Sequence, residues 1–392
     1  MFLQRPQPFN DETLESYFIR VANKNGYSDI HRFLLATKKF LQEIDHRKFS
    51  TFPTDITLIN PCSSKYHSTA RTHSLLKLSQ LTFNEPSELL GLAVNRSSMK
   101  FSPDFSALIR GSEVFPRYFL RTEQMPCCPL CLAEHGYASY FWHLSGYDYC
   151  HKHKIKLVYE CLCGKVYDYR KDGLSGICSD CGKPLAWDET ENDKDKIAIA
   201  TWLAGEDVTP LPSVPASHRW GLLHWWQSIR EKYDAKSFLI FWHHWPQSFD
   251  EVIEERIQFN LEYAVVERSQ LRLKDLLGSL FFSSIHLPNR DLKSNFILKQ
   301  LFSYLENHLW QDLGLLAELR INALEACLVL NCSIEQIASM IKQKLLTPNC
   351  RLNNNIPLNV TSYIFSLGDI YCLWLSEFQT PEFNRDHYIS RW

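Results

Sequence analysis

The sequence contains no long uninterrupted run of apolar residues. A membrane-spanning helix needs about 20 consecutive, predominantly apolar residues, and no window of the 392-residue chain approaches that length. The N-terminal stretch from Met1 to Pro6 also lacks the apolar region of a secretory signal. We therefore expect a cytoplasmic protein that has no membrane partner.

The sequence also lacks a strong excess of charge of either sign. It carries 42 Lys and Arg residues against 44 Asp and Glu residues, which gives a formal net charge of -2. Proteins that grip duplex DNA by themselves usually carry a basic face strong enough to raise the charge of the whole domain. The charge balance weighs against such a protein, although it is compatible with a local basic patch.

Several common catalytic motifs are missing. Gly164-Lys165 and Gly182-Lys183 are not followed by Ser or Thr, as a phosphate-binding P-loop requires. Pro126 precedes Cys127, but no His-x-Glu of a zinc deaminase stands upstream of them, and the His-Glu-x-x-His of zinc proteases does not occur. We predict that the protein is not an enzyme. A two-metal nuclease site made of scattered carboxylates is the enzymatic alternative.

The sequence does contain closely spaced cysteine and histidine pairs, all between Cys127 and Cys181. Zinc binds four nitrogen or thiolate ligands in a tetrahedron, and ligands one or two residues apart in a tight turn can converge on one ion. Thirteen cysteines fit a reducing compartment, in which thiolates stay free to bind metal. We predict two structural zinc ions, held by Cys128, Cys131, Cys150, His153, Cys161, Cys163, Cys178 and Cys181.

Spacing alone leaves the pairing of these ligands open. A sequential arrangement puts the first four on one ion and the last four on the other, whereas a cross-braced arrangement uses the same eight residues. Cys127 and His151 lie beside the predicted ligands, but only Cys128 has the two-residue gap to Cys131. Gly164 and Gly182 follow the second cysteine of their pairs, where such a turn commonly needs a positive φ.

Composition and periodicity indicate a mainly α-helical protein. Apolar residues make up 45% of the chain and charged residues 22%, and the length allows two or three domains. We predict an N-terminal helical domain with a helix-turn-helix over residues 1–115 and tandem zinc-ribbon or zinc-finger modules over residues 116–190. A C-terminal helical domain follows over residues 191–392.

The N-terminal domain shows helical spacing in two places. The segment from Pro8 to about Leu41 predicts two helices that are separated at Gly26, with Asn10 and Ser28 as N-caps. The first of them should bury Leu14, Tyr17, Phe18 and Val21. Two further short helices flank a turn at residues 84–86, as either a helix-turn-helix or two core helices. We expect residues 97–116 to be an irregular connection.

The C-terminal domain should be helical beyond the prolines at positions 210, 212 and 215. One buried helix is predicted over residues 271–282 and another over residues 301–310. The tryptophans near residues 220 and 242 fit core anchors, with a partner-binding hot spot as the alternative. The candidate core residues are Trp225, Ile229, Phe238, Phe241, Trp242, Phe249 and Ile253.

A second helix-turn-helix-like segment is predicted near residues 320–348. One helix should end near Asn331, and Ser333 should cap the next. The second helix should bury Ile334, Ile337, Ala338 and Ile341 and expose Gln336, Ser339, Lys342 and Gln343. These polar side chains suit either base recognition or an ordinary solvated face.

Taken together, these residues resemble the TniQ family of transposon target-selection proteins. The resemblance begins with residues 11–22 and Asn25-Gly26, and it continues through Trp142, Leu157 and the cysteine and histidine pairs. Beyond Cys181, the length and the helical stretch that ends in Phe378-Gln379 and Phe383-Asn384-Arg385 to Arg391-Trp392 resemble the compact TniQ of type I-F CRISPR-associated transposons, which are related to the Tn-seven type.

The resemblance implies a bacterial adaptor without catalytic activity. Such proteins are implied to form homodimers and to dock on the type I-F Cascade complex of Cas proteins and guide RNA. They are also implied to recruit the transposon AAA+ ATPase, which engages the transposase, so that target DNA is contacted through the complex. The family's zinc ligands carry over to all eight predicted positions. The alternative is a site-specific DNA-binding target selector that acts without a guide RNA.

Overall fold

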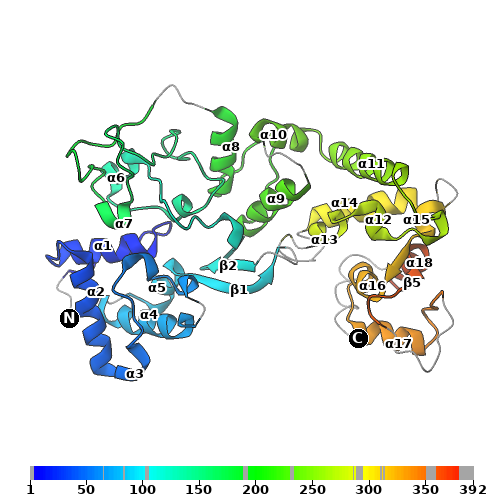
Figure 1. Ribbon diagram of the computed structural model, residues 1–392, viewed down its shortest axis with the longest axis horizontal. Coiled ribbons are helices and arrows are strands. Elements are labelled where there is room, and N and C mark those ends of the chain that lie inside the picture. Colours follow the sequence, from blue (N-terminus) through cyan, green and yellow to red (C-terminus); the bar gives the residue numbers. More distant parts are fainter. Residues whose placement is uncertain are drawn as a thin grey trace. The chain divides into compact units, whose positions relative to one another are not determined.

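A computed structural model of the chain describes residues 4–64, 66–82, 84–101, 106–188, 193–229, 234–285, 287, 295–309, 311, 314–349 and 359–378. The chain divides into two compact units, Met1–Ile240 and Phe241–Trp392. Helices dominate both units, and the strands form one three-stranded and one two-stranded sheet within the described ranges (Figure 1). The mainly helical class agrees with the sequence. The predicted three-domain division stays a prediction.

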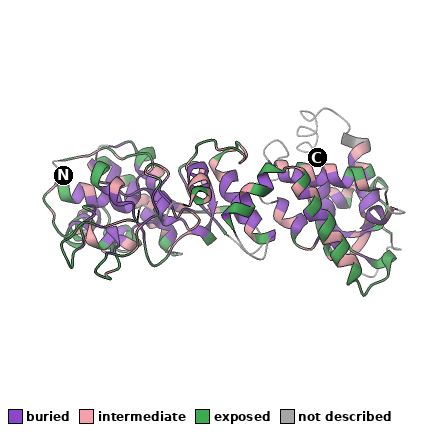
Figure 2. Ribbon diagram, turned by 90° about the horizontal axis from the view of Figure 1, so that it is seen from above, coloured by how far each residue is buried: buried purple, intermediate pink, exposed green. Residues whose placement is uncertain are grey.

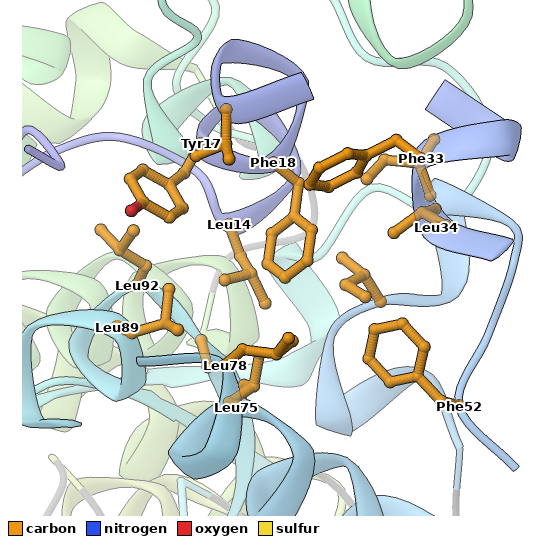
Figure 3. Close-up of a cluster of buried hydrophobic side chains, with 14 of the residues drawn as sticks. Leu14, Tyr17, Phe18, Phe33, Leu34, Phe52, Leu75, Leu78, Leu89 and Leu92 are labelled. Carbon is orange, nitrogen blue, oxygen red and sulfur yellow. The ribbon is translucent and has the colours of Figure 1, made fainter. Parts of the chain in front are cut away.

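The first unit begins with α1 (Leu14–Lys24), α2 (Ile30–Ile44) and α3 (His46–Phe49). After the short 3-10 turns η1 (Ile56–Leu58) and η2 (Pro61–Ser63), the chain forms α4 (Ser68–Thr82) and α5 (Pro86–Leu92). Leu14, Tyr17, Phe18 and Val21 are all buried, as predicted, and they pack on α2, α4 and α5 (Figure 3). This apolar cluster fixes the position of α1.

Both predicted N-caps in this region are wrong, Asn10 by three residues and Ser28 by one. Thr13 caps α1, because its hydroxyl accepts a hydrogen bond from the Ser16 N–H, and Asp29 caps α2 through the His31 N–H. Asn10 precedes α1 by several residues and does not cap it. Gly26 follows α1 with φ +79°, so the predicted helix end is confirmed.

The irregular connection predicted over residues 97–116 is wrong. Strands β1 (Val94–Lys100), β2 (Ser106–Arg110) and β3 (Glu113–Pro116) form an antiparallel sheet in the order β1-β2-β3. Gly111, at φ +56°, occupies the tight turn between β2 and β3. A Gly-Ser pair between two short apolar runs is a hairpin signal that was available in the sequence.

The rest of the first unit consists of short elements and then longer helices. The short elements are η3 (Arg117–Phe119), α6 (Pro129–His135), η4 (Tyr140–His143) and α7 (Tyr169–Asp172). They are followed by α8 (Lys194–Leu203), α9 (Ala216–Ile229) and α10 (Ala235–His243), which crosses the unit boundary. Trp220, Trp225, Trp226 and Trp242 are buried and Trp245 is half-buried, which supports core anchors over an exposed hot spot. All seven candidate core residues from Trp225 to Ile253 are buried.

The second unit contains α11 (Gln247–Glu262), η5 (Arg268–Gln270), α12 (Leu273–Leu277), α13 (Leu280–Ile285), α14 (Phe296–His308) and α15 (Leu315–Glu318). The single helix predicted over residues 271–282 is wrong, because Gly278 adopts φ +56° and separates α12 from α13. Trp310, the last residue of the helix predicted over residues 301–310, lies outside the described residues. Residues 379–392, which carry part of the resemblance to the compact TniQ, also lie outside them. Buried residues run through the interior of both units (Figure 2).

The second unit ends with β4 (Arg320–Asn322), α16 (Ala323–Leu330), α17 (Ile334–Lys342), β5 (Tyr363–Ser366) and α18 (Leu367–Phe378). Strands β4 and β5 pair antiparallel. As predicted, α16 ends at Asn331, which adopts φ +50°, and Ser333 caps α17. The two helices are bent by 96° at the break between them, within the roughly 90–120° range of helix-turn-helix motifs.

The predicted inner face of α17 is wrong. Only Ile337 is buried, whereas Ile334 is 39% exposed, Ala338 is exposed and Ile341 is half-buried. Across the described ranges, no single helix is long and apolar enough to cross a membrane, and only the bent pair α16 and α17 passes that test together.

Candidate metal centres

The first four predicted ligands come from two turns. Cys128 is the N-cap residue of α6, Pro129 occupies the first turn, and Cys131 lies one turn further on. Cys150 and His153 lie in a tight turn, in which the Lys154 N–H donates to the Cys150 carbonyl and Lys154 adopts φ +58°. The Cys127 and Val158 backbones pair with each other and bring the two turns together.

In this first group the ligand atoms are spaced like the corners of a tetrahedron. The Cys131 and Cys150 sulfurs are 3.6 Å apart, and His153 Nδ1 lies 3.4 Å from the Cys128 sulfur and 3.3 Å from the Cys131 sulfur. A tetrahedron with metal–sulfur bonds of about 2.3 Å has edges of about 3.8 Å. The four side chains therefore fit one zinc-sized ion.

His153 is oriented by a carboxylate. While Nδ1 faces the three thiols, Nε2 lies 2.9 Å from the Glu134 Oε2 atom. A metal-binding histidine commonly donates its second ring N–H to such a group, which fixes the tautomer and the ring orientation. Glu134 follows Cys131 by three residues on α6, so the helix places both on neighbouring positions. Sequence reasoning missed Glu134, although its helical spacing from Cys131 was a usable signal.

The second group lies in two similar turns. In each, the backbone N–H of a glycine donates to the carbonyl of the first cysteine, from Gly164 to Cys161 and from Gly182 to Cys178. Gly164 adopts φ +87° and Gly182 adopts φ +67°, so the predicted positive φ values are confirmed. Backbone bridges Glu160–Val166 and Ile177–Pro184 close the two turns.

The second group also has tetrahedral spacing. The Cys161 and Cys181 sulfurs are 3.6 Å apart, and the Cys163 and Cys178 sulfurs are 3.7 Å apart. Within each group of four, all ligand atoms lie within 4.8 Å of one another. The eight side chains thus assemble sequentially, not in the cross-braced alternative. Both clusters could hold metal ions, and their thiolate and imidazole ligands are those that zinc prefers.

Neither neighbouring candidate joins a cluster. Cys127 is fully buried, and burial raises the pKa of its thiol well above the usual value, so it stays neutral. The His151 Nδ1 atom lies 2.6 Å from the Tyr147 hydroxyl. The choice of Cys128 over Cys127 agrees with the geometry.

Local hydrogen bonds favour the thiolate of one cysteine in each cluster, Cys150 in the first and Cys178 in the second. Backbone N–H groups of the turn lower the pKa of the Cys178 thiol to about 7. Hydrogen bonds from Cys128 and Cys131 lower the pKa of Cys150, and this shared proton network raises the pKa of Cys131. A bound zinc ion would replace these protons and cross-link turns that are distant in sequence.

Residues 11–16 connect α1 to the segment that carries the first cluster. The Thr13 hydroxyl is 2.9 Å from the Tyr169 hydroxyl, which in turn is 2.6 Å from His143 Nε2. The Ser16 hydroxyl accepts the Ala138 N–H, and the Ala138 carbonyl accepts the Thr13 N–H. This motif is therefore the buried joint between the N-terminal helices and the metal-binding turns.

The same joint buries charged groups. Arg20 pairs with Glu12 at 3.0 Å, and burial raises the pKa of the Glu12 carboxyl to about 7. The Arg110 guanidinium donates to the Asn10 and Glu12 carbonyls and lies over the Tyr140 ring. Strand β2 is thereby attached to α1.

Comparison with known families relates part of this chain to a protein family. Residues 3–157 match the family model described as TniQ. The chain carries a TniQ domain. That domain includes the α1 motif and all four ligands of the first cluster, whereas the second cluster follows it in sequence. The TniQ domain indicates a transposition-associated protein. No curated protein matches the chain.

Proposed function

We propose that the protein is a transposition target-selection adaptor. It docks on a type I-F Cascade complex of Cas proteins and guide RNA, and it recruits the transposon AAA+ ATPase and, through that ATPase, the transposase. It acts as a homodimer, has no catalytic activity of its own, and contacts target DNA through the complex. The TniQ domain over residues 3–157 is the observation that carries this proposal.

The metal clusters support a structural role. Each cluster has four protein ligands at tetrahedral spacing, so a bound zinc ion would have no open position for substrate or water. The two ions would stabilise residues 128–181, a stretch in which helices are short. A scaffold of this kind suits a protein that holds other macromolecules.

Exposed apolar side chains support protein docking in the second unit. At the end of α11, Phe259 is 61% exposed and Val265 is fully exposed. Ile334 on α17 and Leu345, three residues after that helix ends, are also exposed. Exposed apolar groups that gather in one place commonly mark protein interfaces.

Direct DNA binding is the second candidate. The 96° bend between α16 and α17 favours it, because helix-turn-helix motifs have this geometry. However, the outer surface of α17 combines Ile334 and Ala338 with few cations, and the chain has a net charge of -2. A helix that reads DNA usually presents polar and basic groups instead. We therefore favour docking to proteins.

Co-purification with a guide-RNA-loaded Cascade tests the proposal. We expect the full chain to elute with the complex and a mass measurement to count two copies. Cascade without any bound copy of the chain would contradict docking, and a single copy would contradict the homodimer. If the chain alone bound one duplex sequence tightly, with an affinity that fell steeply as salt rose, the DNA-binding alternative would hold.

A further inference from the structure

The first unit contains a pocket that the metal clusters do not use. It has a volume of about 780 Å³, within the range of roughly 300–1,000 Å³ that small-molecule sites occupy. One wall is the stretch around η1 and η2, from Thr54 to Ser63, and the other is the stretch from Arg117 to Met125. The lining also includes the buried residues Glu15, His143 and Arg170.

The buried residues contribute little negative charge. Arg170 donates to both carboxylate oxygens of Asp168. One Glu15 oxygen accepts a hydrogen bond from Asn60, and the other has no hydrogen-bond partner among the described residues. Burial raises the pKa of the Glu15 carboxyl and lowers the pKa of His143 to about 3, which favours neutral forms of both.

Four cationic side chains line the pocket, those of Arg117, Arg121, Arg170 and Lys171, and they outnumber its carboxylates. Arg117 and Lys171 are exposed and make no ion pair among the described residues. Arg121 pairs with Asp148, but its Nε atom is buried and has no hydrogen-bond partner within the described part of the chain. Three carboxylates line the pocket as well: the buried Glu15 and the exposed Asp55 and Glu123. The Asp55 Oδ1 atom accepts the Thr57 N–H and hydroxyl.

The lining also includes an apolar set of side chains that could contact a flat ring. Its members are Ile30, Ile56, Leu58, Val94, Leu120 and Met125. Apolar walls with a few convergent polar groups are typical of ligand sites. Surplus donors call for a ligand that is rich in acceptor oxygens, as phosphates are.

We propose that this pocket binds a nucleotide, with its phosphate at Arg117 and Lys171 and its base against the apolar side chains. The nucleotide is either free or the terminal unit of a single strand, since both present the same groups. Nucleotide binding here does not depend on the adaptor function.

Calorimetric titration of the full chain tests this proposal. The probes are adenosine 5′-monophosphate, inorganic phosphate and a 5′-phosphorylated RNA trinucleotide. We expect the monophosphate or the trinucleotide to bind at least about tenfold more tightly than phosphate. Binding of the trinucleotide alone identifies a strand end as the ligand. Equal affinities for phosphate and both nucleotides, or no binding of either nucleotide, would overturn the proposal.

Variants locate the binding. Arg117→Gln should weaken nucleotide binding about tenfold, the loss of one charge-assisted contact, whereas Arg47→Gln on α3 is the matched control and should leave it unchanged. Leu58→Ser should weaken nucleotide binding and leave phosphate binding as it was. Arg117 and Leu58 are both exposed, so folding should tolerate these changes. Unchanged nucleotide affinity in Arg117→Gln would refute this assignment.

Discussion

At the scale of single residues, the hydrogen-bond partners of the metal ligands influence how tightly those ligands bind the metal. The His153 ring faces three thiols with Nδ1, while its Nε2 atom meets the Glu134 carboxylate at 2.9 Å. Glu134 thus acts through His153 and does not bind the metal itself. Partners of this kind typically change metal affinity by about 10–100-fold.

Glu134→Gln should therefore weaken zinc binding at the first cluster by about tenfold. The ring of His153 would lose its anionic partner while all four ligands stay in place. Competition with a chromophoric chelator measures the affinity of each site. Glu88→Gln, which changes an exposed carboxylate on α5, is the control and should leave both sites unaltered. An unaltered first site in Glu134→Gln would show that Glu134 has no positioning role.

Glu12 should make stability depend on pH. Its pKa is about 7 in the folded chain, because of burial, against 4.5 for an unperturbed glutamate. Between these values the folded state binds more protons than the unfolded state, so the contribution of Glu12 to stability is complete below pH 4.5 and is lost as the pH rises to 7. The slope is at most about 1.4 kcal/mol per pH unit.

Denaturant unfolding of the wild type and of Glu12→Gln between pH 4.5 and 7 checks this expectation. The difference between the two proteins isolates Glu12 from other titrating groups. We expect the advantage of the wild type to shrink as the pH rises. A pH-independent difference would mean that Glu12 titrates alike in both states.

At the scale of elements, the metal-binding turns depend on backbone conformation. Gly164 and Gly182 have positive φ values, and a Cβ atom at either position would meet nothing within 4 Å. The cost of a side chain there is consequently conformational, about 1 kcal/mol. Gly91, inside α5, has the same open surroundings without a positive φ, which makes it a matched control.

Gly182→Ala should lower the free energy of unfolding by about 1 kcal/mol, whereas Gly91→Ala should be neutral or stabilising by about 0.4–1 kcal/mol. Denaturant unfolding of the zinc-loaded protein measures both. If the two substitutions had the same effect, the turn would not require a left-handed residue.

The two isoleucines of α17 provide a second test at this scale. Ile337 is 2% exposed and Ile334 is 39% exposed on the same helix. Ile337→Ala should cost about 2–5 kcal/mol of stability, the usual range for a buried isoleucine. Ile334→Ala should lower the stability by much less than Ile337→Ala does. Equal losses would mean that the exposed face of α17 is covered in the folded protein.

Sequence patterns predicted the elements that local chemistry determines. The ligand spacing anticipated both clusters, and the apolar period of residues 14–21 anticipated the face of α1 that packs in the core. Tertiary contacts determined the rest. Thr13 caps α1 because residues 11–16 bind the metal-binding segment, and the sequence offered Asn10 as an equally good cap. Similarly, the apolar period of α17 does not reveal that Ile337 is the one residue of this helix that is buried.

At the scale of the whole molecule, the two units are stabilised in different ways. The first joins an apolar helical core to two metal clusters through the buried motif at residues 11–16. The second is helical, and the described residues place no cysteine cluster in it. A metal-dependent first unit follows from this division, since structural zinc contributes on the order of 10 kcal/mol or more to the folding of small modules.

Elemental analysis combined with native mass measurement of the purified full chain tests the central claim most directly. We expect two tightly held zinc ions per polypeptide, and zinc-poor or insoluble protein for Cys131→Ser and for Cys178→Ser. Cys332→Ser, outside both clusters, should keep both ions. Fewer than two ions in the wild type, or two ions in either ligand variant, would contradict the account.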